Sequence, residues 1–139
     1  CLDNNKWWGV PLAARAVVWN TLPGADDGKD VWAAFNQAMV IGEKAGVRLP
    51  HAFYAISALG KDDKARLRDG IKRYVNVKED FKANPQYRLV DALAGMVIGG
   101  LSDKLWTEGV GTRTPPGMLG KFWDEKAEKA EAVDVGDLL

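Results

Sequence analysis

Three side chains are the candidates for catalytic chemistry in this sequence: Glu43, Glu108 and His51. A glycan hydrolase needs a carboxylic acid whose pKa is raised by apolar surroundings, and both glutamates have apolar neighbours in the sequence. Glu43 falls late in the most apolar predicted helix, and Glu108 follows Trp106 at the edge of a loop. His51 is the only histidine and so the only obvious general base. The simpler interpretation is that both glutamates are ordinary exposed residues near helix ends.

Metal and cofactor motifs are not recognisable in the sequence. A transition-metal site needs several ligands at fixed spacing, whereas the chain has one cysteine and one histidine, far apart. Residues 25–30 contain the acidic residues of a calcium loop but place alanine at ligand positions. Residues 108–114 hold two glycines and Arg113, without the strand and lysine of a phosphate-binding loop. We expect no metal and no cofactor, and we take Arg113 and Trp106 as candidates for a binding loop.

Basic residues gather between Lys61 and Lys82, where eight lysines or arginines accompany five acidic residues. Lys64, Arg68 and Lys72 fall on one stripe of a predicted helix, which could bind nucleic acid or an acidic partner. The whole chain has 19 basic and 19 acidic residues, so its formal net charge is zero. Because phosphate neutralisation supplies most of the affinity of nucleic-acid binders, this balance makes nucleic acid the less favoured partner.

The sequence starts at Cys1, followed closely by Trp7 and Trp8. A cysteine at this position is explained by cleavage of a signal peptide at a lipid-attachment site, by removal of the initiator methionine, or by another processing end. If Cys1 carries lipid, the two indoles would lie at the membrane interface, where tryptophan is favoured. Otherwise they close one end of the helical core. The first alternative predicts a lipid-anchored protein of a bacterial cell envelope, and a virion is the other expected location.

Helical periodicity and helix-ending residues dominate the sequence, and no alternating pattern predicts a β-strand. We expect an all-α fold, a compact bundle of about five to seven helices forming a single domain over 1–139. Residues 1–10 are an N-terminal segment in this prediction, and residues 124–139 are a solvent-exposed C-terminal helix and tail. No internal repeat at solenoid spacing is evident. The predicted helices cover residues 11–22, 29–44, 50–59, 62–75 and 84–100, followed by a turn at 105–106 and a helix from Pro116.

These observations favour a non-catalytic helical adaptor or structural protein that binds a protein partner in a larger assembly. The expected partner surface is the Trp7–Trp8 region or the loop over 108–117. One alternative is a small cell-wall glycan hydrolase with a glutamate as general acid. Another is a weak binder of nucleic acid or an acidic partner through the basic residues 61–82.

Overall fold

The computed structural model describes residues 2–77 and 81–125, which form five α-helices and one short 3₁₀ helix. No strand occurs among these described residues. The all-helical prediction is therefore confirmed, at the lower edge of the expected number of helices. The elements in chain order are α1 (Val10–Thr21), α2 (Val31–Ala45), α3 (Leu49–Gly60), α4 (Lys64–Val75), η1 (Pro85–Tyr87) and α5 (Arg88–Val110).

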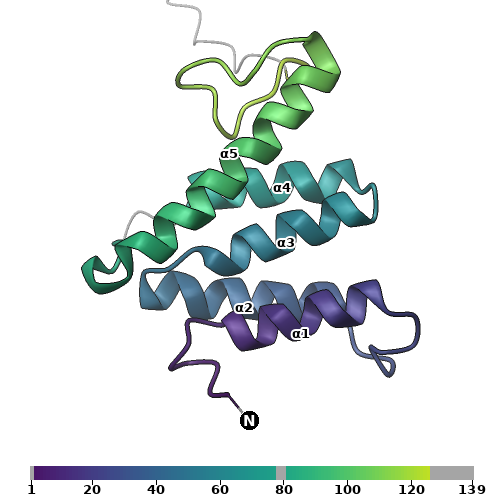
Figure 1. Ribbon diagram of the computed structural model, residues 1–139, viewed down its shortest axis with the longest axis vertical. Helices are drawn as coiled ribbons and strands as arrows, with labels where there is room; N and C mark the ends of the chain where they lie inside the picture. The colour runs from purple at the N-terminus through teal and green to yellow at the C-terminus, as the bar shows by residue number, and fades with distance from the viewer. Residues whose placement is uncertain (1, 78–80, 126–139) are drawn as a thin grey trace, which may run out of the picture.

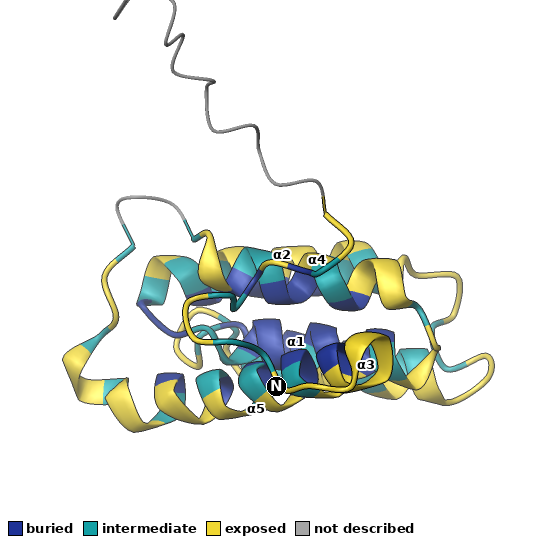
Figure 2. Ribbon diagram, turned by 90° about the horizontal axis from the view of Figure 1, so that it is seen from above, coloured by how far each residue is buried: buried dark blue, intermediate teal, exposed yellow. Residues whose placement is uncertain are grey.

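The helices lie in two layers, with α1, α3 and α5 in one layer and α2 and α4 in the other (Figures 1 and 2). Helix α3 is central, because it contacts each of the other four α-helices. Seven of its twelve residues are buried, including His51. A helix surrounded in this way can contribute polar groups only to the interior or to the one side that its neighbours leave open.

The layer of α1, α3 and α5 has a regularity that the sequence did not reveal. These helices begin at evenly spaced positions, residues 10, 49 and 88. Ala16, Ala55 and Ala94 occupy the same position relative to each start, and all three are fully buried. A small side chain at a helix contact lets the two backbones approach closely. Helices α2 and α4 do not follow the same spacing, so the regularity belongs to one layer.

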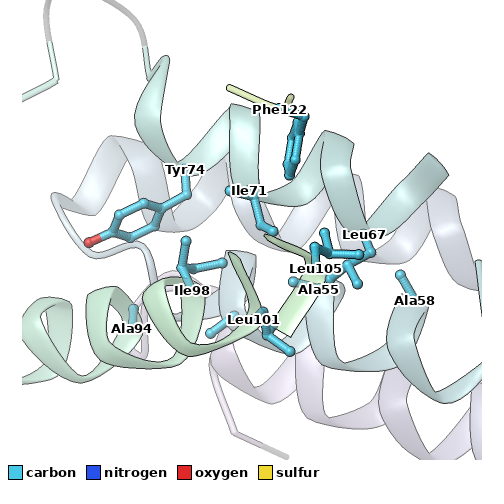
Figure 3. Close-up of a cluster of buried hydrophobic side chains, with 11 residues drawn as sticks. Ala55, Ala58, Leu67, Ile71, Tyr74, Ala94, Ile98, Leu101, Leu105 and Phe122 are labelled. Atoms are coloured by element: carbon cyan, nitrogen blue, oxygen red, sulfur yellow. The ribbon is translucent and has the colours of Figure 1, made fainter. Parts of the chain in front are cut away.

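Two clusters of buried apolar side chains form the core. One joins α3, α4 and α5 and includes Phe122 from the C-terminal turns (Figure 3). The other joins α1 and α2 to Tyr54 of α3. Trp32 packs against both clusters. Burial of these side chains is the main driving force for packing the five helices together.

Three of the helix starts are capped by a polar side chain. The side chain of Asp30 accepts a hydrogen bond from the backbone of α2, and Asp63 does the same for α4. Asn84 caps η1, directly before Pro85. Gly46 ends α2 with φ 78°, a left-handed conformation that glycine adopts without steric cost. These local signals were readable in the sequence because each satisfies backbone groups that a helix end leaves unpaired.

Two predicted elements in the C-terminal part were wrong. Helix α5 does not end at Gly99–Gly100 but continues through Leu105 and Trp106 to Val110. Residues 116–125 form turns instead of the helix expected from Pro116. The segment nevertheless packs on the helices, because Phe122 is buried and the ring of Trp123 lies against Gly109. The exposed helix expected beyond residue 125 lies outside the described residues.

In the described part of the chain, we find no helix with the length and apolar character that crossing a bilayer requires.

Candidate functional site

The structure brings together two of the three predicted catalytic candidates. Nε2 of His51, in α3, lies 2.8 Å from Oε1 of Glu43, in α2. The same oxygen accepts a hydrogen bond of 2.9 Å from Nε of Arg73, in α4. A second group of Arg73 donates to Oδ1 of Asn36 at 2.9 Å. One carboxylate therefore connects α2, α3 and α4.

The environment sets the charge state of both candidates. Burial opposes ionisation of Glu43, but hydrogen bonds from His51 and Arg73 outweigh it and lower the pKa of Glu43 from 4.5 to about 2. Burial lowers the pKa of His51 below its usual 6.5. Its Nδ1 is buried and has no hydrogen-bond partner, so a proton there would be left unsatisfied. The pair is thus a carboxylate accepting from a neutral imidazole.

A second ion pair lies beside the first. Arg48, between α2 and α3, binds both carboxylate oxygens of Asp91 in α5, with its Nε 3.0 Å from Oδ1. The backbone N–H of Arg48 also donates to Oδ1 of Asp91 at 2.9 Å. The guanidinium lies over the ring of Tyr74, 4.0 Å from its centroid, and donates to the carbonyl of that residue. The Arg48 guanidinium outweighs the effect of burial and keeps the pKa of Asp91 below its usual value.

We call these seven residues the inter-helix network. Its members come from four α-helices and from the α2–α3 connection, and all are buried or half-buried except Asn36: Asn36, Glu43, Arg48, His51, Arg73, Tyr74 and Asp91. His51 does not line any of the three clefts described on the surface, which lie at the α3–α4 turn, at the α1–α2 connection and beside Asn36. A general acid on a glycan needs a raised pKa and access to substrate. Glu43 has a lowered pKa, and its Oε1 already has two hydrogen-bond partners, so it lacks the raised pKa that a glycosidase acid needs.

The third catalytic candidate and its tryptophan neighbour are separate from this network. Glu108 lies exposed in the last turns of α5 and forms an ion pair with Lys104. The hydrogen bond from Lys104 lowers the pKa of Glu108, the opposite of what a general acid needs. Trp106 is buried, and its indole N–H donates to the carbonyl of Lys121 at 3.2 Å. Its ring is part of the packing between α5 and the C-terminal turns.

The basic stripe of α4 faces the C-terminal turns. Arg68 contacts both carboxylate oxygens of Asp124, at 2.8 and 2.9 Å, and Lys72 forms an ion pair with Glu125. Lys64 is exposed and lines a cleft of about 390 Å³ where the α3–α4 turn meets the end of α5. The stripe is therefore largely neutralised by acidic residues within the chain, and residues 78–80 of the basic stretch lie outside the described residues.

The N-terminal segment lies against α2. Gly9 has φ 76°, and a side chain there would collide with the backbone of Ala38. Trp8 stacks on Tyr87, with 4.3 Å between ring centroids, and so joins the segment to the start of α5. Trp7 is 42% exposed, and Nζ of Lys6 lies 5.7 Å from its ring centroid. The predicted lipid-bearing Cys1 lies outside the described residues.

The remaining surface carries two features. Arg113, predicted for the binding loop, is exposed after α5. Large apolar side chains are also exposed, and most of them lie on α1, α3 and α5: Val18, Ile56, Leu89, Leu93, Met96 and Val110. Leu22 just after α1, Val40 on α2 and Val75 on α4 are exposed as well. Among the described residues, no group of three or more histidine, cysteine or acidic side chains is arranged to hold a metal ion.

No family model matches this chain, and neither the curated proteins nor the solved structures contain a significant match. The functional conclusion therefore depends on the geometry alone.

Five residues of the inter-helix network were not among the predicted site residues: Asn36, Arg48, Arg73, Tyr74 and Asp91. A signal for Asp91 exists, since it is the one charge within the apolar run from Leu89 to Leu101. A charge on the apolar face of a helix needs a partner when it is buried. The sequence does not say which of the 19 basic residues supplies it.

Proposed function

We propose that this chain is a non-catalytic helical adaptor or structural protein that binds a protein partner through the layer of α1, α3 and α5. The single observation that carries the proposal is the set of large apolar side chains exposed on all three helices of this layer. Val18 comes from α1, Ile56 from α3, and Leu93 and Met96 from α5. Exposed apolar side chains that gather on one side are a common mark of protein-binding surfaces.

The packing of α3 determines which side of this layer is exposed. Helix α3 packs on α1 and α5 within its layer and on α2 and α4 behind it. Ile56 is exposed and so faces the one direction that these four neighbours leave open. Figure 2 likewise shows exposed residues along the side of α5 that points away from α4. We call this side of the layer the outer face.

The state of the ionisable groups supports binding over catalysis. Glu43 has a pKa of about 2 and Glu108 has a lowered pKa, whereas a glycosidase acid needs a raised one. The nucleic-acid alternative is also less favoured, since Arg68 and Lys72 are paired with acidic residues of the same chain. The outer face, in contrast, carries apolar side chains that are 44% to 74% exposed.

Site-specific photo-crosslinking tests the proposal. A benzophenone amino acid replaces Ile56 on the outer face, and the chain is produced in the cells from which the sequence comes. The matched control places the same group at Ala33, an exposed position of α2 in the other layer. We expect a discrete protein adduct from position 56 that is absent from position 33. Equal adduct patterns from the two positions would contradict the proposal.

A further inference from the structure

The outer face of α5 carries a continuous stripe that no described element covers. Leu89 is 75% exposed, Met96 74% and Leu93 49%. At 3.6 residues per turn these positions lie on one side of the helix. We define the α5 stripe as these three residues with the small residues on the same side: Leu89, Ala92, Leu93, Met96, Gly99 and Gly100.

Two glycines in the middle of a helix need a physical reason, because glycine is the least favourable helix residue apart from proline. For Gly95 the reason lies within the chain, since a Cβ there would lie 2.8 Å from Oη of Tyr74. For Gly99 and Gly100 the described structure gives no such steric reason, because a Cβ at either position meets no atom within 4 Å. Both remain helical and leave a shallow surface beside the large side chains of the stripe.

We infer that the α5 stripe binds the α5 stripe of a second copy of this chain, antiparallel, about a two-fold axis that passes near Met96. A two-fold interface brings residue i of one copy to residue j of the other, and residue j to residue i. With the axis at Met96, Leu93 of each copy lies beside Gly100 of its partner on one flank of the contact, and Ala92 lies beside Gly99 on the other flank. Each large side chain therefore meets a shallow place, as close packing between helices requires.

Charge complementarity favours the same arrangement. Arg88 and Asp103 lie at the two ends of the stripe, and neither forms an ion pair among the described residues. Oδ1 of the half-buried Asp103 accepts a hydrogen bond of 3.0 Å from the backbone N–H of Thr114, so the ion pair of the dimer would use its Oδ2. The helix turn places them about 60° apart, on the same flank of the stripe. A two-fold axis perpendicular to the helices joins like flanks, so Arg88 of one copy meets Asp103 of the other. Lys104 lies toward the other flank and is already paired with Glu108.

The inference deepens the proposed function, because it names a second copy as the partner of the α5 part of the outer face. A single helix pair buries less area than a standard permanent interface. We therefore expect a dimer that dissociates on dilution. Sedimentation equilibrium over a range of concentrations measures this association.

Disulfide trapping tests the position of the axis. In a chain with Cys1→Ser, which removes the only natural cysteine, Met96→Cys places one thiol beside its symmetry mate. The matched control is Leu89→Cys, at a position of the same helix with equal exposure. In the antiparallel dimer two Leu89 positions are displaced by about 20 Å along the helix axis, too far for a disulfide. We expect a trapped dimer from position 96 and none from position 89.

A charge exchange tests the register. Arg88→Asp places two acidic residues opposite each other and should weaken association by about tenfold, since each dimer contains the pair twice. Adding Asp103→Arg should restore it, because the ion pair then re-forms in reverse. Circular dichroism melting of each variant separates lost association from lost folding. A double variant that associates no better than the single one contradicts the register.

Equal trapping at positions 89 and 96, or a chain that stays monomeric at high concentration, overturns the antiparallel dimer. The proposed function is judged separately, by the adduct at position 56 on α3. If the chain is monomeric but still gives that adduct, the dimer is disproved and the proposed adaptor function is retained. If the chain dimerises but gives no adduct at position 56, the adaptor function is disproved and the self-association is retained.

Discussion

Glu43 and His51 form the closest contact between two of the residues that the sequence singled out for chemistry, with 2.8 Å between Oε1 and Nε2. The imidazole is fully buried, and its carboxylate partner is held in the ionised form by Arg73 as well. The pair resembles half of a catalytic triad in composition, but its further hydrogen-bond partner among the described residues is Arg73, which is not a nucleophile. Its effects should therefore appear in folding stability.

Stability should fall as the pH drops below 6.5, because the pKa of His51 is lowered in the folded state. Below pH 6.5 His51 is protonated in the unfolded chain but remains neutral in the folded chain, so protonation favours unfolding. Each unit of lowering corresponds to about 1.4 kcal/mol. Urea unfolding at a series of pH values measures the effect. His51→Gln, which keeps an N–H donor, should remove the dependence between pH 6.5 and the lowered pKa, and an unchanged dependence would contradict this assignment.

Glu43 should contribute a second loss of stability at lower pH. Its pKa is about 2 when folded and 4.5 in the unfolded chain, so its contribution is complete above 4.5 and is lost as the pH falls toward 2. Glu43→Ala should lower the free energy of unfolding at pH 7 by about 2 kcal/mol, because it leaves two buried donors unpaired. Chemical denaturation measures this loss. Asp27→Asn is the control and should have little effect, because it removes a charge at an exposed position and asparagine tolerates the left-handed backbone found there.

Asp91→Ala should be among the most destabilising single changes. It leaves the guanidinium of Arg48 half-buried without its carboxylate, which costs about 3 kcal/mol when a buried pair is broken. The double variant with Arg48→Met should be more stable than Asp91→Ala alone, since the stranded charge is gone. A double-mutant cycle from urea unfolding gives the coupling free energy between Arg48 and Asp91. Additive effects of the two changes would show that the contact contributes little.

Gly100→Ala should affect folding and association in opposite directions. The new methyl group meets no atom of its own chain, so the monomer should become more stable by up to about 1 kcal/mol. The same methyl group should weaken the proposed dimer, because it fills the shallow place that receives Leu93 of the partner. Thermal unfolding at low concentration and sedimentation equilibrium measure the two effects. Gly95→Ala is the contrasting control and should lower monomer stability, since the Tyr74 hydroxyl occupies that space.

Local sequence signals predicted the helix starts but not the end of α5. Asp63 and Asn84 are followed directly by helical turns, and their side chains cap the backbone as expected. Gly99 and Gly100 resemble a terminator, yet α5 continues past them for ten residues. Packing of Leu101 and Leu105 on the core outweighs the low helix propensity of two glycines.

Only part of the candidate site could be predicted from the sequence, for a similar reason. Glu43 and His51 could each be proposed from residue type, but their contact depends on how α2 packs on α3. The partner of Asp91 lies 43 positions away along the chain, and no local pattern relates the two. Exposure is equally a tertiary property: Trp106 and Met96 are both large and apolar, yet one is buried and the other is at the surface.

The contacts of α3 with all four other helices also bear on how the molecule opens. No partial unfolding that releases α3 can spare the rest, because both apolar clusters use its residues. The slowest-exchanging amide protons should accordingly be those around Ala55, and they should exchange only through global opening. For the same reason, cutting the chain within α3 should leave two fragments that fold only when they are mixed.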